Sequence, residues 1–361
     1  MKNCFLFLIS VVLFLSCVDK KEIELNFLDE YVLVDSTTFE NTIIGGLSGV
    51  DYVNNQYYFV VDDAQNPRVL LANIAIFDNK IKSIDFKSII FLNDSTTNFY
   101  IENTLDLESI FFDEKTNEIN LVSEGSIRKN KLPSVFKIDK KGAFIESFPL
   151  PKNLSNLKTI QHNAAFEGSS KSIDNKGFWT VFEAPLKSDG VAPTFTKTSS
   201  PIRITYFDKE SKKATKQFAY QLEHITKPSK GNINLNGATA ILEYKENHFF
   251  VIERTYQNGY GSYGNIIRIF DAIVDEKSTN ILEIDTLESV KFIPLKKRLV
   301  FNFEDVKKSL TSGIIDNIEG ITLGPKLSNG NQSLVLVADD NFQSFGKQLN
   351  QFILLEIQTN K

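Results

Sequence analysis

Carboxylates recur at the ends of apolar segments, and they are the feature of this sequence best suited to chemistry. Five apolar runs stop at an acid, and these acids are Asp63, Glu124, Glu183, Glu253 and Asp339. A second set of acids stands shortly before three of the same runs, namely Glu108, Glu167 and Glu319. Several carboxylates within a few Å of one another cannot all stay ionised unless a cation or an arginine neutralises them. Oxygen-only clusters suit hard cations, and flexible multi-carboxylate geometry suits calcium better than magnesium.

Four arginines stand near these acids and have two possible partners. Arg254 follows Glu253 directly, while Arg128, Arg203 and Arg268 lie in neighbouring segments. They could neutralise the acids or hold an anionic substrate such as a phosphate, and solvation at the surface is the simpler alternative. The acids also have a purely structural alternative, in which they accept hydrogen bonds from backbone amides and lock one repeat to the next. Zinc is not favoured, because the chain has three histidines and no cysteine after Cys17.

Nucleophile and phosphate-loop motifs do not fit this sequence. The pattern Gly-x-Ser-x-Gly is absent, since Ser48 is followed two residues later by Val50 rather than glycine. The glycine-rich stretch at residues 258–264 lacks the Lys-Ser/Thr ending of a phosphate loop. Carboxylesterase action through an activated serine is therefore disfavoured.

The elements that position the acids are short strands arranged in repeats. Each repeat reads as a hairpin with an asparagine-containing turn, at residues 54–55, 116–117, 174–175, 246–247 and 329–331. A third and often a fourth strand follow, and four antiparallel strands per repeat are typical of a propeller blade. The fold class is therefore all-β, a β-propeller of five or six four-stranded blades. The sixth blade would lie around Leu282 to Phe303, and the strand Glu24 to Val34 would close the ring. We expect residues 24–361 to form a single propeller domain.

The N-terminus has the features of an export signal. An apolar stretch from Cys4 to Leu15 follows a basic start and is too short to span a bilayer. Ser16 and Cys17 resemble a bacterial lipobox, so we predict a signal peptide at 1–16, lipidation at Cys17 and a tether at 17–23. The chain would then lie in the bacterial cell envelope, periplasmic or outer-surface, and contact the membrane through lipid alone. The net charge of -5 makes nucleic acid an improbable partner, and we expect a monomer.

The repeats resemble a known family. Leu107-Glu108-Ser109-Ile110, Phe166-Glu167-Gly168 and Ile318-Glu319-Gly320-Ile321, with Val61-Asp62-Asp63 and Val337-Ala338-Asp339-Asp340, are similar to the "esterase-like activity of phytase" family. The similarity covers about Thr42 to Ile357. It implies a propeller related in plan to calcium-dependent phytases, and an ester or phosphoester hydrolase. One departure is Ala238-Thr239, which stands where the fourth repeat would carry an acid.

These observations lead to one functional hypothesis and one rival. The hypothesis is a lipid-anchored, calcium-assisted hydrolase acting on a small phosphorylated or ester substrate. Its expected residues fall into three sets: Glu183, Glu253 and Arg254 are catalytic; Arg203, Arg268 and Arg128 bind substrate; and Asp63, Glu108, Glu124, Glu167, Glu319 and Asp339 bind metal. The rival is a non-catalytic propeller that acts as a binding or scaffold lipoprotein.

Overall fold

Antiparallel hairpins closed by asparagine turns are the local unit of the computed structural model, which describes residues 23–92 and 97–359. Asn54, Asn55, Asn117, Asn175 and Asn247 adopt φ values between 51° and 61°. This left-handed conformation suits the tight turns of hairpins, and asparagine tolerates it better than most residues. The predicted turns at these positions are confirmed.

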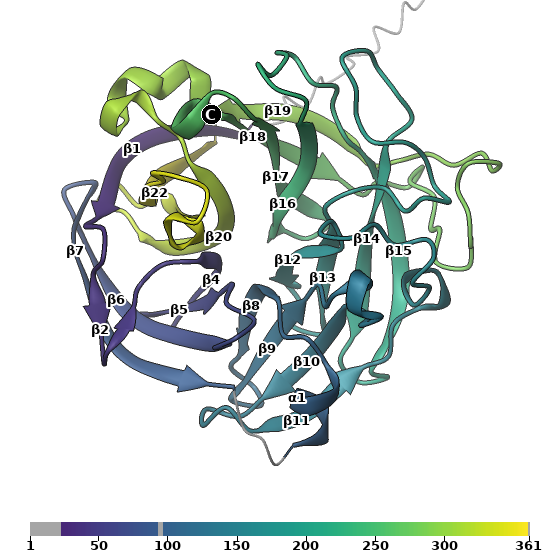
Figure 1. Cartoon of the computed structure of the whole chain (residues 1–361), viewed down its shortest axis with the longest axis horizontal. Helices are drawn as coiled ribbons and strands as arrows, with labels where there is room; N and C mark the ends of the chain where they lie inside the picture. The colour runs from purple at the N-terminus through teal and green to yellow at the C-terminus, as the bar shows by residue number, and fades with distance from the viewer. Residues whose placement is uncertain (1–22, 93–96, 360–361) are drawn as a thin grey trace, which may run out of the picture.

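Each of five sheets contains four antiparallel strands, and together they form the blades of a propeller (Figure 1). The first blade contains β4 (Leu47–Val53), β5 (Gln56–Val61), β6 (Arg68–Phe77) and β7 (Lys80–Phe91). The second contains β8 (Leu107–Asp113), β9 (Glu118–Ser123), β10 (Ser134–Ile138) and β11 (Phe144–Phe148). The third contains β12 (Phe166–Lys171), β13 (Gly177–Phe182), β14 (Pro201–Asp208) and β15 (Lys213–Gln221). The fourth contains β16 (Asn234–Lys245), β17 (His248–Gln257), β18 (Asn265–Ile273) and β19 (Lys296–Asn302).

The fifth blade closes the ring with a strand from the other end of the sequence. It contains β20 (Asn317–Lys326), β21 (Gln332–Asp339), β22 (Asn350–Thr359) and, as its outer strand, β1 (Ile23–Leu33). β1 pairs with β22 along its length, from Ile23 opposite Thr359 to Leu33 opposite Asn350. The predicted closure by the N-terminal strand is therefore confirmed. It leaves β22 with a hydrogen-bonded partner on both sides.

Short elements fill the connections between these strands. They are the two-stranded sheet β2 (Thr38–Phe39) and β3 (Thr42–Ile43), the helix α1 (Asn98–Glu102), and the 3₁₀ turns η1 (Ile127–Lys129), η2 (Lys152–Leu154), η3 (Gly261–Tyr263), η4 (Phe303–Ser309), η5 (Thr311–Gly313) and η6 (Asn341–Gln343). Within the described ranges, no helix is long and apolar enough to cross a membrane. The predicted signal peptide and Cys17 lie outside the described residues.

The hydrophobic core is divided among the five interfaces between neighbouring blades. Between blades three and four, for example, Trp179 and Val181 of β13 pack with Phe249 and Val251 of β17. Between blades two and three, Phe111 packs on Phe178, with ring centroids 4.9 Å apart. Stabilisation by burial of apolar surface is thus spread around the whole ring.

The region considered for a sixth blade belongs to the third and fourth blades. Residues 274–295 form a long loop that lies along the outer strand β15, where Ile281 and Leu295 donate backbone hydrogen bonds to Gln217 and Ala219 at 2.8 and 2.9 Å. The strand β19 is the outer strand of blade four. The loop covers an exposed sheet edge, and the described residues form five blades.

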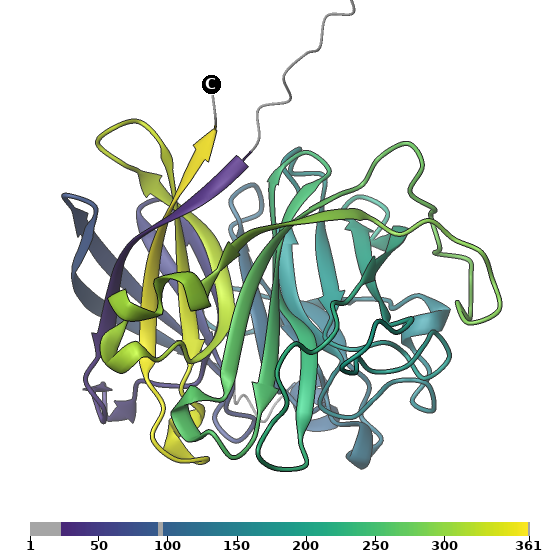
Figure 2. The same cartoon turned by 90° about the horizontal axis from the view of Figure 1, so that it is seen from above.

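The central channel has two chemically different ends. The innermost strands β4, β8, β12, β16 and β20 begin at one end, which we call the carboxylate end. They finish at the other, which we call the turn end because hairpin turns surround it. β1 starts and β22 finishes at the turn end, so both termini of the described chain emerge there (Figure 2).

Candidate functional site

A β-bulge occurs at the same place in all five innermost strands. The register with the second strand slips by one residue there, and the extra residue is Ser48, Glu108, Glu167, Thr239 or Glu319. A bulge redirects the side chain of the extra residue out of the regular pleat. The three glutamates that open hairpins in the sequence are therefore the bulge residues of blades two, three and five.

The residue after each bulge is small because the neighbouring innermost strand passes close to it. These residues are Gly49, Ser109, Gly168, Ala240 and Gly320. A Cβ atom on Gly49 would lie 2.8 Å from the Cα of Ser109, and one on Gly168 would lie 2.9 Å from the backbone nitrogen of Ile241. The repeated pattern of an apolar residue, a bulge residue and a small residue thus has a steric cause: five strands converge on one axis.

In addition to the five bulge residues, a second set of five residues comes from the ends of the second strands. In each blade one residue lies opposite the residue two positions before the bulge, and these residues are Asp62, Glu124, Glu183, Arg254 and Asp339. Four of the five are acids, and blade four supplies an arginine instead. The residue opposite Glu124 is Asp106, which adds a further carboxylate to the site.

Among the described residues, eight carboxylates therefore gather at the carboxylate end, together with the guanidinium of Arg254. They are Asp62, Asp106, Glu108, Glu124, Glu167, Glu183, Glu319 and Asp339. The most compact group is Asp62, Asp106 and Glu108, since one carboxylate oxygen from each lies within 4.8 Å of those of the other two. Glu108, Glu124, Glu167, Glu319 and Asp339 are each less than 9% exposed.

Burial raises the pKa values of these carboxyls, and their mutual repulsion adds to the effect. Burial, with repulsion from Asp339 and Asp106, raises the pKa of Asp62 to about 10. Burial also raises the pKa of Glu124 to about 8, although Glu124 accepts a hydrogen bond from the backbone of Ala165. The pKa values of Glu108 and Glu167 are raised well above the usual range for the same two reasons. Such a cluster favours either protons or a bound cation.

Arg254 neutralises one half of the site. Its guanidinium lies 2.8 Å from Glu319 and 3.3 Å from Glu183. Gly237, directly opposite in the strand pair, leaves room for this arrangement, because a Cβ there would lie 2.4 Å from the Cγ of Glu183. The charge is therefore unevenly distributed: blades three to five hold the arginine, while blades one and two hold the compact carboxylate group.

The structure brings together seven of the residues expected from the sequence. These are Glu108, Glu124, Glu167, Glu183, Arg254, Glu319 and Asp339. It places Asp63 outside this group of residues, which corrects its expected position among the metal ligands. The Asp63 carboxylate pairs with Arg68 at 2.9 Å and accepts hydrogen bonds from the backbone of Gln65 and Asn66, and these contacts lower its pKa.

Glu253 and Arg268 also lie outside the ring, inside blade four. Glu253 is fully buried and accepts hydrogen bonds from Tyr220 at 2.7 Å, Asn236 at 2.8 Å and the backbone of Glu223 at 3.0 Å. Lys297 lies 2.7 Å from it and Arg268 lies 3.7 Å from it. This closed network joins blades three and four, so the expected catalytic role of Glu253 and the expected substrate contact of Arg268 do not agree with their positions.

Arg203 is a buried structural residue, whereas Arg128 lies at the surface. Arg203 is 1% exposed and forms a two-pronged ion pair with Asp189 at 2.6 and 2.9 Å, and it also donates to Gln217. A substrate cannot reach it, which corrects the expected role. Arg128 is exposed on η1, in the loop that follows Glu124 at the carboxylate end.

Sequence reasoning missed Asp62 and Asp106. The side chains of a strand alternate between faces, so an error of one residue moves a side chain to the opposite face. Asp62 and Asp63 stand side by side, and only the pairing of Leu47 with Val61 shows which of them faces the axis. Asp106 could have been found from its position two residues before the bulge residue Glu108.

Comparison with known proteins places the chain in a family. The model of the phytase-like family, described as esterase-like activity of phytase, matches residues 42–342. No curated protein matched the sequence.

Among solved structures, similar chains include exo-beta-1,3-galactanase from Phanerochaete chrysosporium, at 11% identity and a TM-score of 0.47 over 90% of this chain and 63% of that one. The Malassezia sympodialis allergen Mala s 1 matches at 10% identity and a TM-score of 0.38, over 92% and 78% of the two chains. The β-propeller domain of the Trilobed protease from Pyrococcus furiosus matches at 9% identity and a TM-score of 0.31, over 85% and 71%. None of these similarities assigns an activity to the chain.

The family match spans most of the chain and includes all five innermost strands. At the family level it supports a hydrolase-type propeller. The chain belongs to the phytase-like family, described as having the esterase-like activity of phytase.

Proposed function

We propose that the chain is a lipid-anchored, extracytoplasmic hydrolase of small phosphoesters, assisted by calcium bound at the carboxylate end. The observation that carries the proposal is the compact group of Asp62, Asp106 and Glu108, in which one carboxylate oxygen from each residue lies within 4.8 Å of those of the other two. Carboxylate oxygens are the ligands that calcium prefers.

The donor set fits a calcium ion in charge as well as in geometry. Arg254 compensates Glu183 and Glu319, and the described residues around Asp62, Asp106 and Glu108 supply no comparable cation to that half. On the side of Glu319, Asn317 donates its amide nitrogen to that carboxylate at 2.8 Å, and its buried amide oxygen has no hydrogen-bond partner within the described residues. When bound, calcium would polarise a phosphate oxygen and lower the pKa of a coordinated water.

The chain's own residues have defined tasks in this proposal. Arg254 is held in place by its two carboxylate partners, and a guanidinium has five N–H donors. Its remaining donors can bind the phosphate oxygens that the cation does not contact. Glu183, fixed beside Arg254, accepts the proton of the attacking water. Arg128, exposed at the same end, is available to contact the rest of the substrate.

The rival function is a non-catalytic binding or scaffold propeller, and one observation favours it. Several polar groups of the inner ring brace neighbouring blades: Glu124 accepts from Ala165, while Ser48 and Thr239 donate to the backbone carbonyls of Leu107 and Ile318 at 2.7 and 2.8 Å. In that case the acids would serve stability alone.

A phosphatase assay distinguishes the two functions. Purified protein is tested on 4-nitrophenyl phosphate with calcium and with chelator, alongside Glu108→Gln and the matched surface variant Glu304→Gln, whose side chain is 38% exposed. The enzyme proposal predicts turnover that needs calcium, is lost in Glu108→Gln and is retained in Glu304→Gln. Absence of calcium-dependent turnover in protein whose fold is intact by circular dichroism would leave only the binding role.

A further inference from the structure

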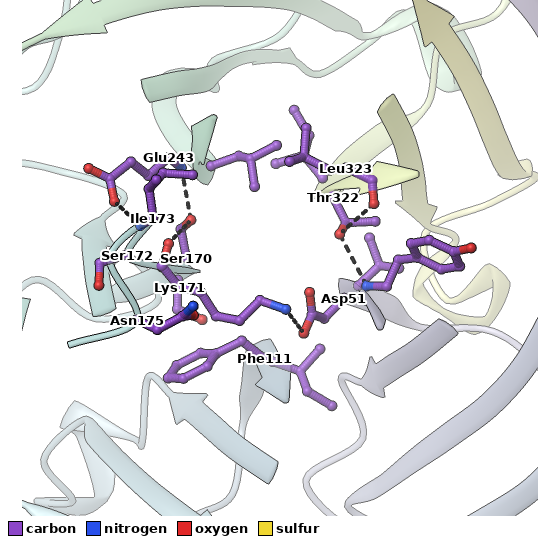
Figure 3. Close-up of a pocket in the computed structure, with 16 residues that line it drawn as sticks. Asp51, Phe111, Ser170, Lys171, Ser172, Ile173, Asn175, Glu243, Thr322 and Leu323 are labelled. Atoms are coloured by element: carbon purple, nitrogen blue, oxygen red, sulfur yellow. Dashed lines mark hydrogen bonds and ion pairs between the residues drawn. The ribbon is translucent and has the colours of Figure 1, made fainter. Parts of the chain in front are cut away.

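The turn end of the channel contains a hollow that the proposed hydrolase does not use. Its volume is about 180 Å³, and the innermost strands of all five blades line it (Figure 3). The carboxylate cluster lies at the opposite end of the same strands. The hollow is therefore a separate site, and its chemistry can be read from its walls.

One wall carries an ion pair between two blades. The ammonium of Lys171, from blade three, lies 3.0 Å from Oδ2 of Asp51, from blade one. The same oxygen accepts a hydrogen bond from the backbone nitrogen of Phe112 at 2.8 Å, which fixes the carboxylate. The other oxygen of Asp51 points into the hollow (Figure 3). Asp51 is only 6% exposed.

The remaining polar groups of the hollow already have structural partners. The hydroxyl of Ser170 accepts from the backbone of Glu243 at 2.8 Å and donates to the carbonyl of Lys171 at 3.1 Å. The hydroxyl of Thr322 accepts from the backbone of Tyr52 at 3.1 Å. Both oxygens of Glu243, the second carboxylate of the lining, accept hydrogen bonds from the backbone nitrogens of Ile173 and Asn247 at 2.9 and 2.8 Å. Lys171 and Asp51 are therefore the charged groups best placed to bind a ligand.

The rest of the lining is largely apolar. Aliphatic side chains from four blades contribute to it, namely Val50, Ile110, Leu242, Ile321 and Leu323. Val50, Ile110 and Ile321 are each at most 5% exposed. A ligand with an aliphatic group gains by removing its own apolar surface from water against this wall and by meeting both members of the ion pair.

We propose that the turn end binds a small zwitterion with an aliphatic side chain, that is, an α-amino acid of the leucine type. Its carboxylate binds the ammonium of Lys171, its ammonium binds the inward oxygen of Asp51, and its side chain contacts the aliphatic wall. A ligand with only one of these charges would leave one member of the ion pair without a new partner. The inference does not depend on the proposed hydrolase activity.

Isothermal titration calorimetry with three probes tests this proposal. The probes are L-leucine, isocaproate, which lacks the ammonium, and isoamylamine, which lacks the carboxylate. We expect saturable binding of leucine, with both analogues at least tenfold weaker. Absence of leucine binding at millimolar concentration, or equal binding of either analogue, would overturn the proposal.

Two variants and a matched control locate the binding. Lys171→Met removes the charge but keeps most of the side-chain length, and Asp51→Asn keeps an oxygen that can accept from Phe112. Both substitutions should weaken the binding of leucine at least tenfold. Lys176→Met changes a lysine of the adjacent turn whose side chain is 78% exposed, and should leave binding unchanged. Thermal unfolding of each variant checks the fold, and unchanged binding by folded Lys171→Met would contradict the assignment.

Discussion

Without a bound cation, the carboxylate cluster should make the protein less stable as the pH rises. Asp62 has an ordinary pKa of 3.8 and a folded-state pKa of about 10, and Glu124 has values of 4.5 and about 8. Because the folded pKa lies above the unfolded one, each group favours the folded state fully below its ordinary pKa. That contribution is lost as the pH rises through the interval between the two values.

The size of the effect follows from these values. Between pH 6 and pH 8 the unfolded chain has Asp62 ionised, while the folded protein keeps it protonated. Over these two pH units Asp62 therefore removes about 3 kcal/mol from the free energy of unfolding. A chain of this length has an unfolding entropy of roughly 0.8 kcal/mol/K, at about 2.1 cal/mol/K per residue. Asp62 alone should then lower the Tm by about 4 °C.

Differential scanning calorimetry at pH 6, 7 and 8, with chelator and with calcium, measures the change of Tm with pH. In chelator the Tm should fall across the series, whereas calcium should remove the decline because it binds the ionised form. At a hundredfold excess over Kd, calcium contributes about 2.7 kcal/mol, again about 4 °C. Asp62→Asn should make the decline in chelator about 4 °C smaller between pH 6 and pH 8, and the remaining decline comes from the other carboxyls with raised pKa values. A Tm in chelator that is constant or rises from pH 6 to pH 8 would refute the reasoning, as would an unchanged Tm with calcium.

Three further predictions concern single residues. Arg254→Met removes the positive charge that compensates Glu183 and Glu319, so the protein should bind calcium more tightly. The KM for 4-nitrophenyl phosphate should rise at least tenfold, because the contact with phosphate is lost. Calcium titration and steady-state kinetics measure these two effects, and an unchanged KM would exclude a phosphate contact. Arg203→Met leaves the fully buried carboxylate of Asp189 without its ion-pair partner. The free energy of unfolding, measured in urea, should fall by about 3–5 kcal/mol, while kcat/KM of the folded fraction stays unchanged. A loss of activity larger than the loss of folded protein would indicate that Arg203 does contact the substrate. If Cys17 is lipidated, the turn end faces the bilayer, so a fluorophore on Phe77→Cys should be quenched by lipid-borne quenchers and one on Phe345→Cys should not. Phe77 ends β6 at the turn end and is 66% exposed, while Phe345 lies in the loop between β21 and β22 at the carboxylate end and is 82% exposed. Equal quenching would contradict this orientation.

The architecture could be predicted from the sequence because its causes are local. Asparagines at hairpin turns and short segments rich in β-branched and aromatic residues each report a short-range requirement. The closing strand could be predicted because a propeller without it has an open edge. The blade count needed the structure, since residues 274–295 cover β15 as a loop and do not form a blade of their own.

The site could be predicted only to within one residue. Adjacent pairs such as Asp62 with Asp63 and Glu253 with Arg254 point to opposite faces, and register decides which member reaches the axis. The sequence alone does not fix that register where a bulge interrupts the strand. The pairing of Arg203 with Asp189 was also hidden, because it depends on a loop folding back onto a strand.

The comparison of Asp62→Asn with Asp63→Asn tests the central claim most directly. The two residues are neighbours of the same type, yet Asp62 belongs to the carboxylate cluster and Asp63 pairs with Arg68 at a turn. Calorimetric titration of calcium into metal-free protein at pH 7.5 should show at least tenfold weaker binding in Asp62→Asn and unchanged affinity in Asp63→Asn. Equal affinities in the two variants, or no calcium binding by the unaltered chain, would contradict the account.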